Sequence, residues 1–284
     1  MKTLLVLIHE PKSSRGLIKY SVNLARELSL NLQLIYVENP KLPAMGTPNL
    51  SAKAMEQLQR NLEQSVKETE IILTRYVKEF MNLISGEMII DITAEVNSEI
   101  KVLEKLIGEG HGKLLVLEST DKHSSWSDNL ITNEIISSVE CPVWIVPGGA
   151  EYYTPEEIVY ATDYKSQDIN TLVRLVDMLG KFSPTITALH ITDDAGFESK
   201  IKETGFQKML QNNTGYQKIN LNALLEAGQD ISKLINDFAI ATEADLIVIL
   251  KENRSFLERI FKASPGKKII KHASIPVLVF HEKE

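Results

Sequence analysis

Two histidines and several carboxylates in the first half of the chain have the chemistry of a metal or acid–base site. His9 and Glu10 follow one short apolar segment, and Glu118, Asp121 and His123 follow another. Imidazole and carboxylate groups are common zinc ligands and general acids or bases. Neither segment has a His-x3-His or comparable spacing, and ordinary loop polarity also explains these residues. We therefore expect no metal and no catalytic residue, and keep His9 and Glu118 as ligand-binding candidates.

The second half carries a different set of polar residues at the corresponding places. Asp163 ends one apolar segment, and the residues after another apolar segment include four cations, Lys251, Arg254, Arg259 and Lys262. These cations could hold an anion, but they alternate with Glu252 and Glu258, so a solvated charged face is the alternative. Asp163 has two interpretations as well. It could contact a ligand, or it could stabilise the exposed amides of a following helix.

The elements that must position these residues are short apolar strands alternating with helices. In the first half we expect strands at 3–8, 32–37, 88–92, 114–117 and 143–146, and helices at 14–29, 52–83, 98–108 and 128–138. The second half repeats this order with strands at 157–162, 185–191, 217–221, 245–250 and 276–280, and helices at 166–181, 197–211, 229–242 and 265–272. Strands without polar alternation, separated by helices, indicate a parallel sheet covered on both faces. Ligands of such sheets bind beyond the carboxyl ends of the strands.

The two halves also close with the same motif. Pro142 and Pro276 are each followed by valine and then by three apolar residues. An internal repeat of this length predicts two copies of one fold. We expect an α/β protein of two tandem, doubly wound, five-stranded parallel-sheet domains, at 1–148 and 154–284, joined by a short turn-prone linker.

Composition excludes several classes of protein. The 284 residues contain 38 Asp+Glu against 31 Lys+Arg, a formal charge of −7, which leaves no basic footprint for nucleic acid. The single cysteine, Cys141, cannot form an internal disulfide and fits a reducing compartment. No apolar run approaches the length of a membrane span. We expect a cytoplasmic protein that binds neither nucleic acid nor membrane.

Three segments of the second half resemble the universal stress protein family, and the resemblance extends over nearly the whole chain as two fused copies. The segment 158–163 resembles the family's first strand and its terminal aspartate, 243–249 its fourth strand, and 272–279 its last strand. The resemblance implies an adenine nucleotide alpha hydrolase-like fold. It also implies that Asp163 contacts an adenine or ribose.

Family members that bind ATP carry G-x2-G-x9-G-[S/T] after the fourth strand, where glycines let the backbone approach phosphates. In the second copy, the glycine positions hold Leu250, Asn253 and Ala263, and only Ser264 matches. The corresponding stretch of the first copy, after Leu117, has no glycine. We expect the ATP loop to be lost in both copies. The ligand-binding candidates of the second domain are Asp163, Leu250, Asn253, Ala263 and Ser264.

The resulting hypothesis is a non-enzymatic tandem universal stress protein with no cofactor, which acts in a stress response by binding a small ligand or a protein partner. The alternative is a protein that binds ATP or AMP through its second domain, with slow or no hydrolysis. A nucleotidyl-transfer enzyme on the same scaffold is a third alternative, although fold alone does not establish function.

The resemblance also bears on how the two copies pair. Family members dimerise through their last strands. Strands 143–146 and 277–280 of one chain could make that contact internally as a pseudo-dimer. A homodimer of the full chain remains open.

Overall fold

The computed structural model describes residues 2–40, 51–80, 88–110, 112–119, 130–193, 196–251 and 275–282. Contacts divide the chain into two compact units. The first unit comprises Met1–Glu118 with Ser137–Val139, and the second comprises Ser119–Ile136 with Glu140–Glu284. The predicted domains, 1–148 and 154–284, follow the sequence repeat instead and remain a prediction.

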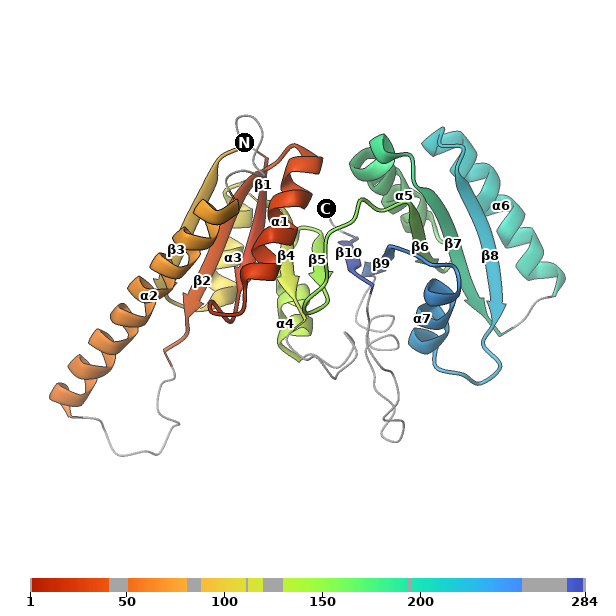
Figure 1. Ribbon diagram of the computed structural model, residues 1–284. Helices are drawn as coiled ribbons and strands as arrows, with labels where there is room; N and C mark the ends of the chain where they lie inside the picture. The colour runs from red at the N-terminus through yellow and green to blue at the C-terminus, as the bar shows by residue number, and fades with distance from the viewer. Residues whose placement is uncertain are drawn as a thin grey trace. The chain divides into compact units, whose positions relative to one another are not determined.

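The first unit contains a parallel sheet in the order β3-β2-β1-β4. Its strands are β1 (Thr3–Ile8), β2 (Asn31–Glu38), β3 (Ile90–Val96) and β4 (Gly112–Glu118), and its helices are α1 (Arg15–Leu28), α2 (Ala52–Phe80) and α3 (Glu99–Gly108). In Figure 1, α1 and α2 lie on the near face of this sheet and α3 on the far face. The central strand β1 is buried from its second residue to its last because helices cover both of its faces.

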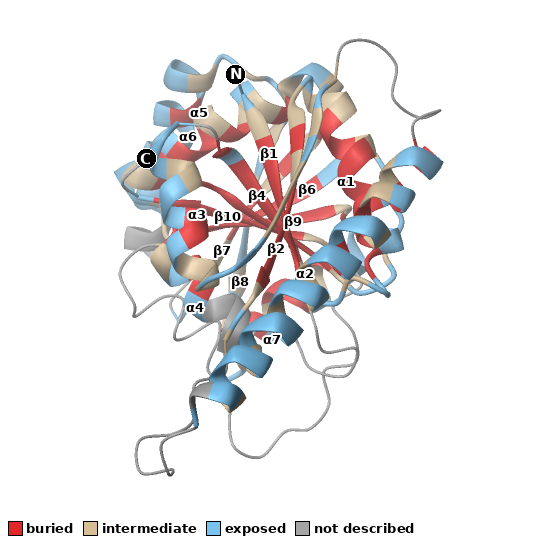
Figure 2. Ribbon diagram, turned by 90° about the vertical axis from the view of Figure 1, so that its left-hand side faces the viewer, coloured by how far each residue is buried: buried red, intermediate tan, exposed pale blue. Residues whose placement is uncertain are grey.

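The second unit contains six strands in the order β5-β10-β9-β6-β7-β8. Its strands are β5 (Val143–Val146), β6 (Glu157–Thr162), β7 (Thr185–Thr192), β8 (Ile219–Leu225), β9 (Leu246–Lys251) and β10 (Val277–His281). Its helices are α5 (Ser166–Leu179), α6 (Phe197–Thr214) and α7 (Ile231–Ala241), with a 3-10 turn at Gly180–Phe182; the short helix α4 (Leu130–Ser138) precedes β5. The buried residues gather along the strands, and the helices turn their exposed faces outward (Figure 2).

The predicted α/β fold is confirmed, and the differences concern strand ends. β3 and β8 each run four residues beyond their predicted ends at 92 and 221, because both are edge strands that contain no fully buried position. A search for continuous apolar runs therefore ends them too early. β4 begins two residues before its predicted start, at Gly112, where a Cβ atom would lie 2.6 Å from Leu5 Cδ1. A side chain at this position would displace Leu5, so glycine allows the close contact between the neighbouring strands.

The two closing strands of the sequence repeat pair with each other, as predicted. β5 and β10 are antiparallel, with Val143 opposite Val279, Trp144 opposite Leu278 and Ile145 opposite Val277. The pairs β1–β2, β1–β4, β2–β3, β6–β7, β6–β9, β7–β8 and β9–β10 are all parallel. β5 therefore follows the first four strands in sequence but belongs by its contacts to the second unit. The predicted helix at 265–272 lies outside the described residues.

Within the described ranges, none of the helices combines the length and the apolar character of a membrane span.

Candidate functional site

The turn between β6 and α5 is organised by a buried carboxylate that sequence reasoning missed. Asp168 is only 3% exposed. Its Oδ1 accepts a hydrogen bond from the Tyr160 hydroxyl at 2.7 Å, and its Oδ2 accepts from the Thr162 hydroxyl at 2.8 Å. The same Oδ2 accepts from the backbone amides of Asp163 and Lys165 at 3.1 and 3.0 Å. Four donors thus hold one buried carboxylate, as a buried charge requires.

This network places Asp163 at the carboxyl end of β6, as predicted from the sequence. The Asp163 side chain is 35% exposed, and its Oδ2 lies 3.5 Å from Lys165 Nζ, which is itself on the surface. Exposed ion pairs of this kind contribute little to stability. The Asp163 carboxylate is therefore positioned by its backbone and stays accessible to a ligand.

A pocket of about 300 Å³ opens beside Asp163. Its lining comes from the carboxyl ends of β6 and β7, from the residue after β8 and from the first turns of α7. Apolar side chains form much of the wall, namely Ala161, Leu189, Ile191, Ile231 and Ile235. A volume near 300 Å³ is at the lower end of the range for small-molecule pockets.

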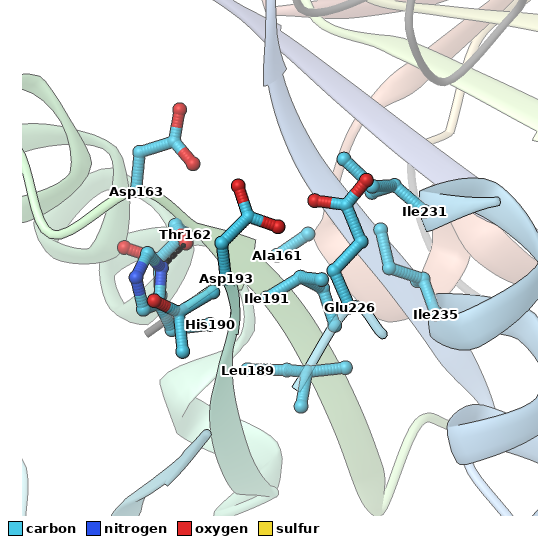
Figure 3. Close-up of a pocket in the computed structure, with 11 residues that line it drawn as sticks. Ala161, Thr162, Asp163, Leu189, His190, Ile191, Asp193, Glu226, Ile231 and Ile235 are labelled. Atoms are coloured by element: carbon cyan, nitrogen blue, oxygen red, sulfur yellow. Dashed lines mark hydrogen bonds between the residues drawn. The ribbon is translucent and has the colours of Figure 1, made fainter. Parts of the chain in front are cut away.

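Three carboxylates lie at this pocket. Figure 3 shows the carboxyl groups of Asp163, Asp193 and Glu226 around one opening, with Asp193 between the other two. Asp193 and Glu226 were not among the sequence candidates, which came from the residues after the first and fourth strands of each copy. Their signal was present, since each is the residue directly after a strand, β7 or β8. The carboxyl ends of neighbouring parallel strands meet at one edge of a sheet.

His190 and Tyr164 support the pocket from the side. His190 Nδ1 lies 2.8 Å from the carbonyl oxygen of Thr162, and because a carbonyl only accepts, this nitrogen carries a proton. The Tyr164 ring stacks on His190 with ring centroids 4.3 Å apart, and it contacts the Phe206 ring at 4.9 Å. Tyr164 has the left-handed backbone, φ 56°, which is a strained conformation for a bulky residue. The Thr162 hydroxyl steadies it by accepting from the Tyr164 amide at 2.9 Å.

The Tyr164 hydroxyl is buried and has no hydrogen-bond partner among the described residues. Burial, with a smaller contribution from the negative charge of Glu203, raises the pKa of Tyr164 to about 12. In the unfolded chain a tyrosine ionises near pH 10. The unfolded state therefore releases this proton first, and stability that is complete below about pH 10 is lost as the pH rises to about 12.

We expect Tyr164→Phe to remove this pH dependence. At pH 8 the variant should match the wild type within about 1 kcal/mol, because the lost hydroxyl has no partner in the described part of the chain. Between pH 10 and 12 the wild type should lose more unfolding free energy than the variant. Urea unfolding at each pH measures both curves, and parallel curves would contradict the assignment.

The remaining candidates of the second domain do not join this pocket in the described structure. Leu250 is 2% exposed and lies inside β9, opposite Phe280 of β10, so its side chain belongs to the core rather than to a ligand loop. The other loop candidates, Asn253, Ala263 and Ser264, lie outside the described residues, as do Arg254, Arg259 and Lys262.

Lys251, proposed from the sequence as an anion-holding cation, is engaged elsewhere. Its Nζ donates to the carbonyl oxygen of Ile136 at 2.7 Å, and His281 Nε2 lies 2.8 Å from the same oxygen. Burial lowers the pKa of Lys251. Positive groups at the end of a helix stabilise its exposed carbonyls, and α4 ends two residues after Ile136. Lys251 therefore caps α4.

In the first unit, His9 and Glu118 lie at the carboxyl ends of the paired strands β1 and β4, as the sequence predicted. The carboxylate near His9 is Glu99, at the start of α3, whose Oε1 lies 3.6 Å from His9 Nε2. Both side chains are largely covered, at 15% and 24% exposed.

The other polar candidates of the first unit do not form a metal site in the described structure. Glu10 is exposed, and Asp121 and His123 lie outside the described residues. Across the residues that the structure describes, no group of three or more His, Cys, Asp or Glu side chains could hold a metal ion.

Comparison with protein-family models gives a match for the second half of the chain. Residues 155–281 match the model of the universal stress protein family. This segment is similar to a universal stress protein domain. The match covers both strands that line the pocket, β6 and β7, so the pocket lies within the matched segment. No curated protein sequence matches the chain.

Solved structures of universal stress proteins share the fold of nearly the whole chain. A universal stress protein from Archaeoglobus fulgidus superposes with a TM-score of 0.62 at 12% identity, covering 98% of this chain and 96% of that one. A putative universal stress protein from Pseudomonas aeruginosa superposes with a TM-score of 0.57 at 13% identity, covering 99% and 92%. The cytoplasmic domain of a prokaryotic cation chloride cotransporter is also similar, with a TM-score of 0.54, 12% identity and coverage of 99% and 96%. Identities this low establish the fold alone.

Proposed function

We propose that this protein acts without catalysis, by binding a small ligand in the pocket of its universal stress protein domain and thereby regulating a stress response. The observation that supports the proposal is the pocket of about 300 Å³ beside Asp163, at the carboxyl edge of β6 and β7. Parallel α/β sheets bind ligands at this edge. The network around Asp168 holds the edge in place without the ligand, which limits the conformational entropy lost on binding.

Binding of an adenine nucleotide by the same domain is the second candidate. It is favoured by Asp163, which lines the pocket at the position where the family resemblance expects a contact with adenine or ribose. Loss of the family's ATP loop, inferred from Leu250, Asn253 and Ala263, is part of the first proposal and argues against the second.

A variant that fills the pocket tests the first proposal. Thr192 lines the pocket at the end of β7, so Thr192→Trp should occlude it. Thr185→Trp, at the opposite end of the same strand, is the matched control. Wild type and control, purified from cells and denatured, should release a small molecule that mass spectrometry detects and that Thr192→Trp lacks. Its addition should raise the midpoint of thermal unfolding by mass action.

Release of the same molecules from all three proteins, with no thermal shift on adding them back, would contradict ligand binding in this pocket. The nucleotide alternative predicts that millimolar ATP or AMP raises the unfolding midpoint of the wild type but not of Thr192→Trp.

A further inference from the structure

We infer that the free edge of β8 pairs with the same edge of β8 in a second molecule of this chain, antiparallel about a two-fold axis. β8 stands at one end of the strand order, and among the described residues it pairs with β7 and with no other strand. An edge strand presents a row of backbone N–H and C=O groups that can take a further strand.

The hydrogen bonds to β7 show which residues of β8 point their backbone groups outward. The carbonyl oxygen of Lys218 accepts from the Ile186 amide at 2.8 Å, and the Glu226 amide donates to the carbonyl oxygen of Thr192 at 2.9 Å. Backbone groups of successive strand residues point to opposite sides, so every second residue from Lys218 to Glu226 faces β7. The residues between them present their N–H and C=O groups to the free edge, namely Ile219, Leu221, Ala223 and Leu225.

β8 lacks the features with which proteins usually protect such an edge. Its seven residues, Ile219–Leu225, include no charged residue and no proline. Toward its end the strand is also uncovered on both faces, because Asn222 is exposed on one face and Ala223 and Leu225 on the other. Leu225 is a large apolar side chain that is 54% exposed. The edge is therefore open and uncharged.

β8 is complementary to itself in an antiparallel pair. When Asn222 lies opposite Asn222 of the second molecule, each outward N–H meets an outward C=O, and Ile219 lies opposite Leu225. The Ile219–Leu225 contact covers the exposed apolar surface of Leu225. An asparagine side chain both donates and accepts hydrogen bonds, so the two Asn222 amides can pair with each other on the axis. This match of the strand with itself favours a second molecule of the chain over an unrelated peptide.

β3, at the other end of the strand order, shows what prevents such pairing. It is also seven residues long, and it pairs with β2 as β8 pairs with β7. β3 carries two exposed carboxylates, those of Asp91 and Glu95. The same two-fold pairing of β3 would place Asp91 directly opposite Glu95 of a second molecule, and like charges in that position destabilise a strand pair. The edge of β3 is therefore protected by charge, and the edge of β8 is not.

Replacing Ala223 with proline tests the pairing. The Ala223 N–H points to the free edge, so proline removes a donor to the second molecule without removing a hydrogen bond to β7. In sedimentation velocity of the full chain, the wild type should form a dimer whose fraction rises with concentration. Ala223→Pro should weaken this dimer roughly tenfold or more, because proline also distorts the neighbouring pairs.

Ala94→Pro is the matched control. Ala94 is the fifth residue of β3, as Ala223 is the fifth residue of β8. Its N–H also points outward, because the neighbouring bonds of Ile89 and Asn97 to β2 set the same alternation. Ala94→Pro should dimerise like the wild type. Circular dichroism and the unfolding midpoint show whether each variant is folded.

Charge variants at Asn222 test the register and do not require that proline be tolerated. Asn222→Asp and Asn222→Lys each place like charges opposite each other on the axis, so each should weaken the homodimer by roughly two- to fivefold. Capture of untagged Asn222→Lys on tagged Asn222→Asp should show that the mixture forms a heterodimer more readily than either variant pairs with itself. Asn212→Asp and Asn212→Lys, at an exposed position of α6, are the controls and should show no such preference.

A wild type that stays monomeric at every concentration would overturn the inference. So would a dimer that Ala223→Pro and both Asn222 variants leave intact, because its interface would then lie elsewhere. Equal weakening by Ala94→Pro and Ala223→Pro would assign the effect to general destabilisation, against the pairing. Assemblies larger than a dimer would contradict a two-fold contact, which uses up the edge of both molecules. If Ala223→Pro does not fold, the Asn222 series decides alone.

Discussion

Replacing Asp168 with alanine should lower the unfolding free energy of the second unit by about 3–5 kcal/mol, because four hydrogen-bond donors lose a buried acceptor together. A typical buried group left unsatisfied costs about 1–3 kcal/mol, and hydrogen bonds to a charged acceptor are stronger. The same change should loosen the turn that carries Asp163 and so weaken ligand binding. Hydrogen exchange of the β6 amides, which reports on this unit alone, measures the stability.

Two further variants distinguish this network from a general loss of charge. Asp177→Ala removes a carboxylate from an exposed position of the same helix and should cost less than about 0.5 kcal/mol. Asp168→Asn should cost about 1–2 kcal/mol, less than Asp168→Ala. Its amide oxygen can accept from Thr162 and the two backbone amides, and its NH2 group can donate to the Tyr160 hydroxyl oxygen. A cost for Asp168→Ala no larger than for Asp177→Ala would refute the role given to the carboxylate.

Replacing Trp144 with alanine should destabilise the second unit by about 3–5 kcal/mol, because it leaves a large cavity in a strand that pairs with β10. Trp144 is 0% exposed and is among the largest fully buried side chains. The expected result is faster hydrogen exchange at Leu278 and Val279, its neighbours across the β5–β10 ladder. This outcome would show that a strand from the first half of the sequence stabilises the sheet of the second.

The control for this prediction is Ile71→Ala in α2, a large apolar side chain that is 70% exposed. It should change stability by less than about 0.5 kcal/mol. If Trp144→Ala left the exchange of the β10 amides unchanged, the placement of β5 in the second unit would be wrong.

Much of the fold was predictable because its strands are short apolar runs that helices cover on both sides. β1 and β9 illustrate this pattern, since nearly every residue in each is buried. The edge strands β3 and β8 were placed but ended too early, because an edge strand needs fewer apolar residues. Gly112 was missed as part of a strand because glycine usually marks a turn, whereas here it allows close packing against Leu5.

The candidate site was predictable in part. The sequence alone determined the order of strands and helices, the duplication, and the place of Asp163 at the end of a strand. Only the tertiary structure decided that Asp163, Asp193 and Glu226 face one opening and that Asp168 holds the turn beneath them. These carboxylates come from turns about thirty residues apart in the sequence, and parallel strand pairing brings the ends of those strands together. No local pattern of charge or hydrophobicity records which strands are neighbours, because that choice depends on how the whole sheet packs.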